Sequence, residues 1–416
     1  MVHILCEENK DYSRINMNVL LVNQYYPPDT SATAVILRDL ALALGRVCSP
    51  IVLSGRPSYN PEFRHGFYFS KTEFMDHVRV DRVGSTSYDR GFLLGRVLNY
   101  VTYLILTVIR GVLINPRPDV VISMTDPPIA GFAAAIISFF RRSTFIYFIQ
   151  DLHPDLAYAV GFPIPKLIAR IWNFFNVLLL KYCDSIIVIG EDMKDLLVSS
   201  KGIEANKIHV IRSGSVEFPS PKTDGTNIIR EIRKNYDFVA IHAGNLGYVG
   251  NFKLIIDAFK DLGDRSIGLV FVGQGAMKTE LMDYAKNVGS IRFIDFYPYD
   301  ELSHVYSAAD LHLISIKTGL EGLVLPSKLY SALKAEKPIF ANVPDTSDVA
   351  KIIKEYQCGV VASTKDALEM SKQIIALKES NTLDKMSVAA SQASEVFDRA
   401  NEIRKFTEIV VEYEKN

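Results

Sequence analysis

The feature that most constrains the fold is an alternation of short runs rich in Val and Ile with amphipathic helical patterns. This alternation is typical of βαβ units, whose strands pair in parallel and whose helices cover the sheet. Seven such runs occupy the first half, at residues 18–24, 50–55, 78–84, 119–124, 144–150, 185–190 and 207–213. Six more follow, at residues 237–244, 268–275, 291–296, 311–317, 338–343 and 359–363. The pattern predicts an α/β protein with two Rossmann-like domains.

The length of the chain also favours two domains, because 416 residues exceed the roughly 250–300 that one core usually serves. The alternation lapses at residues 214–235, which are rich in Gly, Pro, Ser and Thr. We therefore expect an N-terminal domain at 17–215, a linker at 216–235 and a C-terminal domain at 236–393. A last helix, at 394–416, is expected to pack back on the first domain. Residues 1–16 carry charges and no apolar run, and we expect an extension outside the fold.

Open parallel sheets bind ligands beyond the carboxyl ends of their strands. Two such edges facing one another across a cleft would place the functional site in that cleft.

Composition excludes several classes of protein. With 46 Lys and Arg against 47 Asp and Glu, the net charge of −1 offers no general attraction for nucleic acid. The four cysteines lack CxxC spacing, which argues against a zinc site and fits a reducing compartment. No secretory leader is visible, so we expect a cytoplasmic protein.

The segment at residues 93–114 is the nearest to a membrane span. Arg96, Asn99 and Arg110 interrupt it, so it falls short of the roughly 18 clean apolar residues that a span needs. Together with the aromatic stretch at 171–182, it could rest on the inner face of an anionic membrane. Both segments could equally be core helices of the first domain.

Two glycine turns follow strands of the second half. Gly244, Asn245, Leu246 and Gly247 precede an amphipathic helix, and the turn 273–275 reads Gly273, Gln274 and Gly275. Glycines let backbone amides approach a ligand closely, and the positive end of a helix favours phosphate. A tight turn without a ligand explains each of them equally well when taken alone.

A third turn reads GLVLPSKLY and begins at Gly322. Pro326 suits the first turn of a helix and Ser327 can bond exposed amides, but Lys328 opposes the helix dipole. An anionic ligand explains this lysine better than capping does, although a solvated surface lysine is the alternative. Three such turns suggest a nucleotide that carries a pyrophosphate.

Polar side chains also follow the strand at 144–150 in the first half. Gln150, Asp151 and His153 crowd its carboxyl end, where they could transfer a proton or orient a hydroxyl group. A structural role for His153 within its own loop is the alternative. Before the first helix, Tyr25, Ser31 and Thr33 could line the cleft on the side of the first domain, where a second substrate, the acceptor, would bind.

Together these motifs resemble the retaining, nucleotide-sugar-dependent glycosyltransferases of family four, which have the GT-B fold. The resemblance runs from Met17 onward, and GNLG with LPSKLY is most similar to bacterial enzymes of surface-polysaccharide or lipid-linked glycan assembly. It implies that residues 244–247 hold the donor diphosphate and that Glu321 faces the sugar. It further implies that Leu323, Val324, Ser327 and Lys328 approach the diphosphate and ribose, and that Asp151 lies near the reacting centre.

The sequence departs from the family pattern at several positions. Asn245 and Gly250 stand where many members carry Arg and Lys, and Lys328 is our candidate replacement. Ser331 stands at the second glutamate position, and Gln150 stands where histidine is common. The resemblance implies an enzyme that transfers a hexosyl or N-acetylhexosaminyl group without a metal. A sugar-nucleotide epimerase of the same fold and a noncatalytic nucleotide-sugar-binding assembly partner are the alternatives.

Overall fold

The computed structural model describes residues 15–58, 68–88, 93–234, 236–262 and 266–414. The chain divides into two compact units, which are described separately. The C-terminal unit comprises residues 159–161 and 213–399, and the N-terminal unit comprises the remaining described residues. The predicted extension at 1–16 lies outside the described residues except for its last two. Of these, Ile15 donates its backbone N–H to the carbonyl of Val47 at 2.8 Å.

The N-terminal unit is built on one eight-stranded sheet with the order β3-β4-β2-β1-β5-β6-β7-β8. Its strands are β1 (Asn18–Asn23), β2 (Ser49–Gly55), β3 (Ser70–Met75), β4 (Val78–Val83), β5 (Val120–Ser123), β6 (Thr144–Ile149), β7 (Ser185–Val188) and β8 (Ile208–Val210). All pairs are parallel except β3 with β4, which form an antiparallel hairpin at the edge. The central strands are buried along nearly their whole length, as expected of a parallel sheet covered on both faces.

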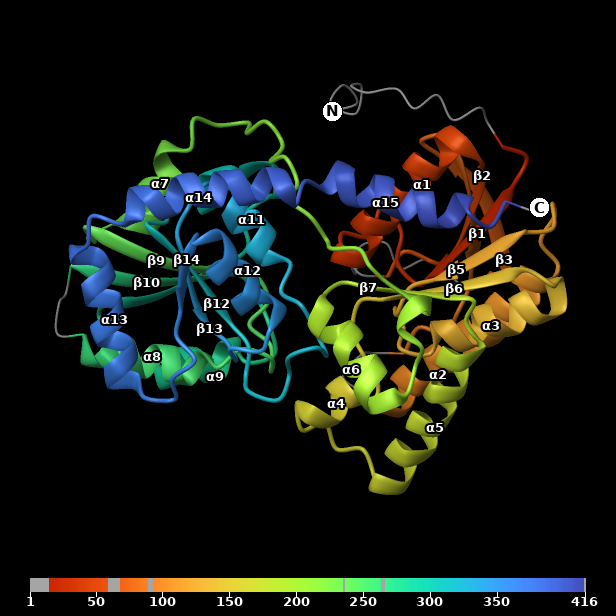
Figure 1. Cartoon of the computed structure of the whole chain (residues 1–416), viewed down its shortest axis with the longest axis horizontal. Helices are drawn as coiled ribbons and strands as arrows, with labels where there is room; N and C mark the ends of the chain where they lie inside the picture. The colour runs from red at the N-terminus through yellow and green to blue at the C-terminus, as the bar shows by residue number, and fades with distance from the viewer. Residues whose placement is uncertain (1–14, 59–67, 89–92, 235, 263–265, 415–416) are drawn as a thin grey trace. The chain divides into compact units, whose positions relative to one another are not determined.

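Seven α-helices belong to this unit: α1 (Ala32–Val47), α2 (Leu93–Val112), α3 (Ala130–Arg141), α4 (Asp155–Ala159), α5 (Lys166–Tyr182), α6 (Glu191–Lys201) and α15 (Arg399–Val411). A short 3-10 helix, η2 (Ala205–Lys207), precedes β8. Right-handed crossovers place α2, α3 and α5 on one face of the sheet, because each leads to a strand on the β8 side. The helices α1 and α15 lie on the other face (Figure 1).

The C-terminal unit has a six-stranded parallel sheet with the order β11-β10-β9-β12-β13-β14. Its strands are β9 (Phe238–Ala243), β10 (Ile267–Val272), β11 (Ile291–Ile294), β12 (Leu311–Ser315), β13 (Ile339–Asn342) and β14 (Gly359–Val361). Its helices are α7 (Thr226–Arg233), α8 (Phe252–Asp261), α9 (Lys278–Tyr284), α10 (Leu302–Ser307), α11 (Lys328–Lys334), α12 (Asp348–Tyr356), α13 (Ala367–Glu379) and α14 (Leu383–Val396), with the 3-10 turn η3 (Tyr299–Glu301). One core packs α8, α9 and α13 on the sheet, and a second packs α7 and α10 on the opposite face.

Two expected segments differ in the structure. The stretch at 216–235, expected as a linker, contains α7, because Ile232 is fully buried in the core against β9. The expected helix at 394–416 is interrupted: α14 ends at Val396 and α15 begins at Arg399. Between them Asp398 forms an isolated parallel bridge with Ser215. Phe406 of α15 then packs against Phe148 of β6, with ring centroids 5.8 Å apart.

Candidate active site

The two glycine turns of the C-terminal unit are bound to each other. Leu246 N–H donates to the carbonyl of Gln274 at 2.8 Å, and Met277 N–H donates to the carbonyl of Leu246 at 2.9 Å. A Cβ on Gly273 would lie 2.1 Å from the carbonyl oxygen of Gly244, and one on Gly275 would lie 2.4 Å from the backbone of Leu246. Gly273 and Gly275 are therefore required for the packing of one turn on the other, a role that the sequence alone did not reveal.

The backbone bonds of the first turn decide which amides remain for a ligand. Gly244 N–H donates to Val272 at 2.8 Å, and Leu246 N–H is used as described. In the described chain no backbone acceptor faces the amides of Asn245 and Gly247. The side chain of Leu246 is fully buried, so it anchors the turn in the core. Gln274 donates to Asp295 at 2.5 Å, and Lys278 also pairs with Asp295.

Lys328 is the first residue of α11, and its side chain lies beside the turn that contains Gly244. Its Cε and Nζ atoms are 3.2 and 3.7 Å from the position that a Cβ on Gly244 would occupy. Burial lowers the pKa of the Lys328 ammonium to about 8. Because desolvation is the only cause of the shift, an anion beside this ammonium would restore the charge that burial disfavours.

The rest of the corner at 319–328 is held by local bonds. Glu321 accepts the N–H of Gly319 at 2.7 Å, and both Gly319 and Gly322 have positive φ, at 88° and 74°. Leu323 is buried and Val324 half-buried, so their side chains belong to the packing of the corner. Ser327 is exposed and makes no side-chain capping bond, contrary to our expectation, and Pro326 stands before the helix instead of at its first position.

The sequence analysis did not single out His242, which lies near the end of β9. Its Nδ1 is 3.0 Å from the carbonyl of Leu313, and its ring meets Phe252 edge to face. Burial, followed by the charge of Lys328, holds its pKa well below the ordinary value. The signal was a histidine inside the apolar run 237–244. A neutral imidazole here avoids a second positive charge next to Lys328.

In the N-terminal unit, a group of acidic and hydroxyl side chains gathers after β1, β5 and β6. Thr125 accepts the backbone N–H groups of Gln150 and Asp151 at 3.3 and 3.4 Å. Thr33 donates its hydroxyl to Asp126 at 2.5 Å. Ser31 lies 3.2 Å from Thr33 and also caps α1 by accepting the N–H of Ala34.

This cluster contains two carboxyl groups, and the charge of one affects the other. Burial, with the charge of Asp126 as the second cause, raises the pKa of Asp151 to about 7. Burial also raises the pKa of Asp126, which the hydrogen bond from Thr33 opposes. Asp126 was missed, although it stands directly after the expected strand at 119–124. A carboxyl group that titrates near neutrality can hold or release a proton.

Gln150, His153 and Tyr25 follow the same strands, the first two after β6 and the third after β1. The ring of His153 stacks on Trp172 of α5 at 6.2 Å, and its carbonyl accepts from Asn176 at 2.8 Å. Burial lowers the pKa of His153 to about 4, which favours the neutral ring at physiological pH. The amide nitrogen of Gln150 is buried without a partner among the described residues. Tyr25 is half-buried, and its carbonyl accepts from Asn23 at 2.9 Å.

A polar cavity of about 220 Å³ lies at the carboxyl ends of β12, β13 and β14. Asn251, Lys317, Asn342 and Thr364 are among the residues that line it. Neither Lys328 nor either glycine turn lines this cavity, so it differs from the place where Lys328 meets Gly244.

Two family models match the chain in adjacent regions. Residues 33–214 match "Glycosyltransferase Family 4", and residues 226–395 match "Glycosyl transferases group 1". The chain has the GT-B fold, and each of its two units matches a glycosyltransferase model. The first match covers the unit with the carboxyl pair, and the second covers the unit with Lys328 and the glycine turns.

Two curated relatives of the chain are named as glycosyltransferases. The probable glycosyltransferase WbjE of Pseudomonas aeruginosa is 24% identical over 62% of this chain and 66% of its own length. The putative glycosyltransferase EpsD of Bacillus subtilis (strain 168) is 26% identical over 46% of this chain and 51% of its own. The chain thus spans just under two thirds of the length of one relative and about half of the length of the other.

Solved structures share the fold of this chain at low sequence identity. Anabaena Alr3699/HepE, in complex with UDP and glucose, has a TM-score of 0.69 and 16% identity, over 95% of this chain and all of that one. WaaG, a glycosyltransferase involved in lipopolysaccharide biosynthesis, has a TM-score of 0.66 and 15% identity, over 94% and 99%. In the described part of the chain, no three His, Cys, Asp or Glu side chains gather as a metal ion would require.

Proposed function

We propose that the protein is a retaining transferase that moves a hexosyl or N-acetylhexosaminyl group from a nucleoside-diphosphate sugar to a hydroxyl group. The proposed acceptor is a glycan or a polyprenyl-diphosphate-linked sugar in the assembly of a cell-surface polysaccharide. The match to two glycosyltransferase models supports the reaction class. The UDP and glucose of HepE support a nucleotide sugar, and the role of WaaG supports a surface glycan.

The placement of Lys328 against Gly244 is the observation that carries the donor site. Cleavage of a nucleotide sugar leaves a diphosphate, and negative charge develops on its oxygens in the transition state. The ammonium of Lys328 and the amides of Asn245 and Gly247 are the groups that would stabilise this charge. The bonds between the two turns hold the segment that carries these two amides in place before the reaction.

We assign the acceptor side to the carboxyl pair of the N-terminal unit. Asp151, with a pKa raised to about 7, would orient a sugar hydroxyl, with Asp126 and Thr33 behind it. In the retaining reaction that the resemblance implies, the leaving diphosphate itself helps to take the proton from the attacking hydroxyl. No protein nucleophile and no metal is then required, and turnover should persist in a metal chelator.

The test is the substitution Lys328→Ala, with Lys334→Ala of the same helix as control, since Lys334 pairs with the surface residue Glu217. We expect Lys328→Ala to lower turnover of a nucleotide sugar at least tenfold, which is about 1.4 kcal/mol of barrier. Its melting temperature should stay near that of the parent. The affinity of the parent for UDP should fall as pH rises above about 8, because the ammonium loses its proton there.

Unchanged turnover and UDP affinity in Lys328→Ala would remove this lysine from the mechanism. Incubation with a nucleotide sugar alone separates the alternatives. An isomerised sugar would identify an epimerase, and binding without turnover in any acceptor screen would favour an assembly partner. A transferase gives slow hydrolysis at most.

We also propose a cytoplasmic location, with peripheral contact at the inner face of the cell membrane. A lipid-linked acceptor would require such contact.

A further inference from the structure

The outer side of α2 carries an apolar stripe that no other described element covers. Leu94, Leu98, Val101, Ile105 and Ile109 follow one another at intervals of three or four residues, so they share one face of the helix. All five are more than a third exposed, and Leu94 reaches 65%. Surface residues at this spacing on a water-facing helix are normally polar, so this face requires a partner.

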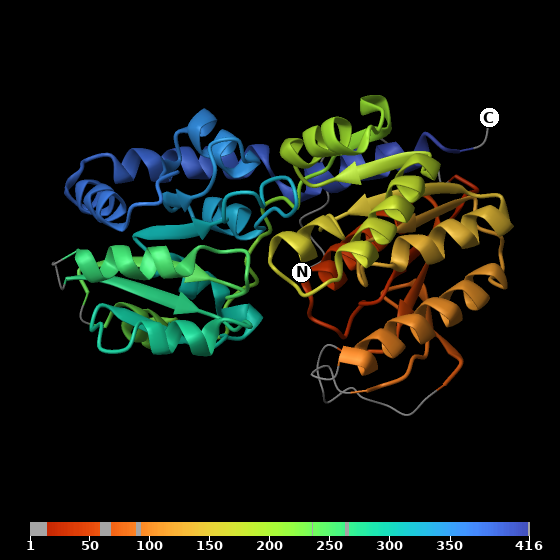
Figure 2. The same ribbon diagram turned by 90° about the horizontal axis from the view of Figure 1, so that it is seen from below.

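The stripe continues across two neighbouring helices. α2 packs against α3, and α3 packs against α5. Figure 2, which views the molecule from below, shows α2 in orange, α3 in gold and α5 in yellow-green side by side on one face of the sheet. On α5, Leu167, Ile171, Phe174 and Leu178 repeat the same spacing, and their exposed fractions lie between 47% and 68%. Phe139 of α3, at 67%, lies on the helix between them. We call these three outer helix sides the apolar face.

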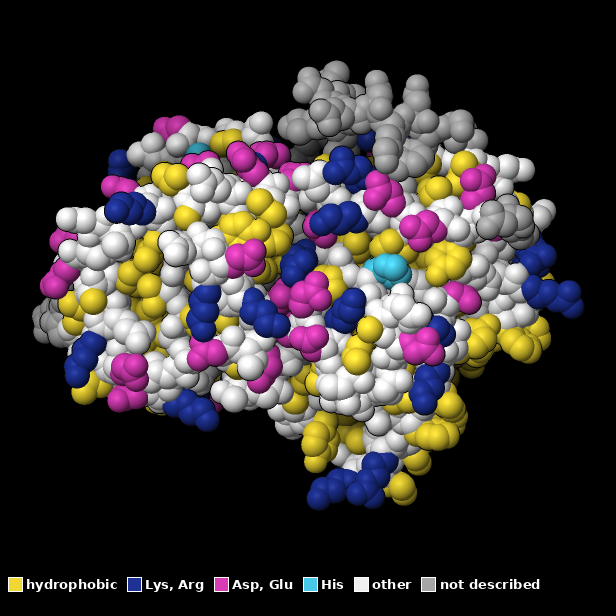
Figure 3. All heavy atoms as spheres, viewed as in Figure 1, with side chains coloured by type: hydrophobic (Ala, Val, Ile, Leu, Met, Phe, Trp, Pro, Cys, Tyr) yellow, Lys and Arg dark blue, Asp and Glu magenta, His cyan; other side chains and the backbone are white. Residues whose placement is uncertain are grey.

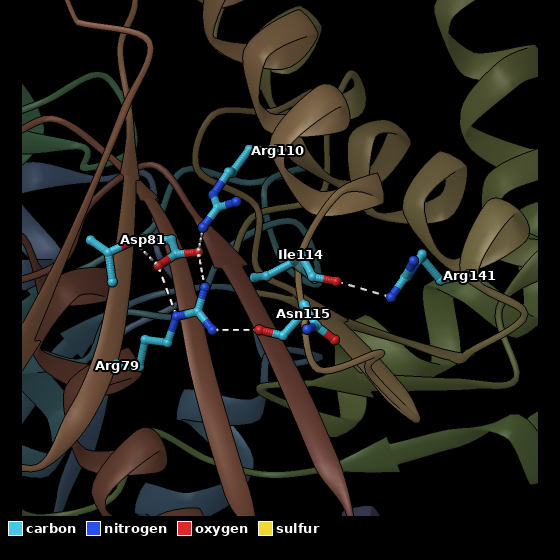
Figure 4. Close-up of polar contacts among 7 residues, drawn as sticks. Arg79, Asp81, Arg110, Ile114, Asn115 and Arg141 are labelled. Carbon is cyan, nitrogen blue, oxygen red and sulfur yellow. Dashed lines mark hydrogen bonds and ion pairs between the residues drawn. The ribbon is translucent and has the colours of Figure 1, made fainter.

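Buried polar contacts fix the orientation of these helices. Arg110 of α2 donates to the fully buried carboxylate of Asp81 at 2.6 Å, and Arg79 donates to the same carboxylate (Figure 4). Arg141 of α3 donates to the carbonyl of Ile114, at 2.9 Å. The polar sides of α2 and α3 are thus committed to the protein interior. The apolar stripes cannot turn inward without breaking a buried ion pair.

The charged residues within the three helices of the apolar face have one sign. The sequences of α2, α3 and α5 contain no Asp and no Glu. Lys166, Arg170 and Lys181 of α5 are exposed, as is Arg142 directly after α3. Figure 3 shows hydrophobic side chains, in yellow, over the lower part of this unit, with Lys and Arg side chains, in dark blue, at its tip. In a protein of net charge −1, this surface is locally basic.

We propose that the apolar face docks on the surface of an anionic lipid bilayer. The stripes would enter the headgroup region, and the surrounding Lys and Arg side chains would contact lipid phosphates. Among the described residues, no helix is both long and apolar enough to cross a membrane, so the contact is peripheral. The inference deepens the proposed function, and it rests on that function only for its purpose, which is access to a lipid-linked acceptor.

A second copy of the chain fits the apolar face less well than a bilayer does. A twofold contact places the same surface on both sides, so Lys166, Arg170 and Lys181 would face a surface that carries the same positive charges. An anionic surface offers the opposite charge to every one of them. Charge complementarity therefore favours lipid over self-association.

The docking helix α5 also touches the proposed acceptor side. Trp172 stacks on His153, and Asn176 donates to the carbonyl of the same residue. His153 is two residues from Asp151. A sugar held at the bilayer surface beside α5 would thus lie near the loop that carries the carboxyl pair.

The experiment measures cosedimentation with vesicles of phosphatidylglycerol and phosphatidylcholine, against vesicles of phosphatidylcholine alone. We expect binding to the anionic vesicles that weakens with salt. The double variant Ile171→Glu with Phe174→Glu should bind at least tenfold more weakly. Val388→Glu, at an equally exposed site of α14, is the matched control and should bind like the parent. Trp172 is the one tryptophan of the chain, so its fluorescence reports directly on α5.

The double charge variant Lys166→Glu with Arg170→Glu keeps the test valid if the apolar variant does not fold. It should lose at least tenfold in affinity for anionic vesicles while retaining the parent melting temperature. Absence of vesicle binding at low salt would overturn the proposal, and so would an equal loss in Val388→Glu. A dimer in solution that the same variants abolish would overturn it in favour of a second copy. UDP affinity and donor hydrolysis, measured without vesicles, report on the transferase site independently.

Discussion

At the scale of the residue, Asp151 makes the stability of the N-terminal unit depend on pH, and Asp126 adds to the effect. Burial and the neighbouring carboxylate raise the pKa of Asp151 to about 7. An aspartate in an unfolded chain titrates near 3.9. The contribution of Asp151 to the stability of the folded protein is therefore fully present below about pH 4 and is lost as the pH rises through 7.

This sign leads to a prediction for Asp151→Asn, which removes the ionisable group and leaves a similar shape. Its melting temperature should exceed that of the parent at pH 8, where the parent holds a buried charge. The difference should disappear as pH is lowered toward 4. Calorimetry between pH 4 and 8 measures it, and Asp126→Asn should act in the same direction because it lowers the pKa of Asp151. A difference that does not depend on pH would show that Asp151 titrates normally.

Sequence reasoning singled out several residues of these two clusters, whose roles stay predictions, but it missed their environments. Lys328 was singled out because it opposes the helix dipole, and the structure brings it to Gly244. Asp126 was passed over because a single acid after a strand is a weak signal until Thr33 and Asp151 are seen beside it. The stacking of His153 on Trp172 joins residues 19 positions apart, which no local pattern shows.

At the scale of the element, the two glycine turns behave as one structural part. Each donates to or packs on the backbone of the other, so neither can shift alone. The pattern of apolar runs located nearly every strand. It missed β3, SKTEFM, because this edge strand is mostly exposed and polar.

The prediction at this scale concerns Gly275→Ala. The new Cβ would lie 2.4 Å from the backbone of Leu246, which is hydrogen-bonded and cannot retreat. We expect a loss of roughly 1–3 kcal/mol in the free energy of unfolding, as for an overpacked core, and weaker UDP binding. Gly289→Ala is the control, since nothing lies within 4 Å of its Cβ position. Equal stability of the two variants in denaturant titrations would contradict the interlocking of the turns.

At the scale of the whole molecule, the chain returns to its N-terminal unit after it has formed the C-terminal unit. The C-terminal unit closes at residue 399, and α15 then belongs to the N-terminal unit. Arg212 N–H donates to Glu402 at 2.8 Å, and the fully buried Phe406 packs on Phe148.

We therefore expect Phe406→Ala to destabilise the N-terminal unit, although the substitution is ten residues from the end of the chain. Loss of a buried phenylalanine typically costs about 3–5 kcal/mol. In calorimetry with and without UDP, the transition that Phe406→Ala lowers should differ from the one that UDP raises. A single transition affected by both would show that the two units unfold together.

The return of α15 also has a consequence during synthesis. The N-terminal unit lacks one of its helices until residues 213–399 have been translated. At about 5–20 residues per second, this delay lasts roughly ten to forty seconds. Throughout that time Phe148 lacks its packing partner Phe406, so this part of the first core stays incomplete in the nascent chain.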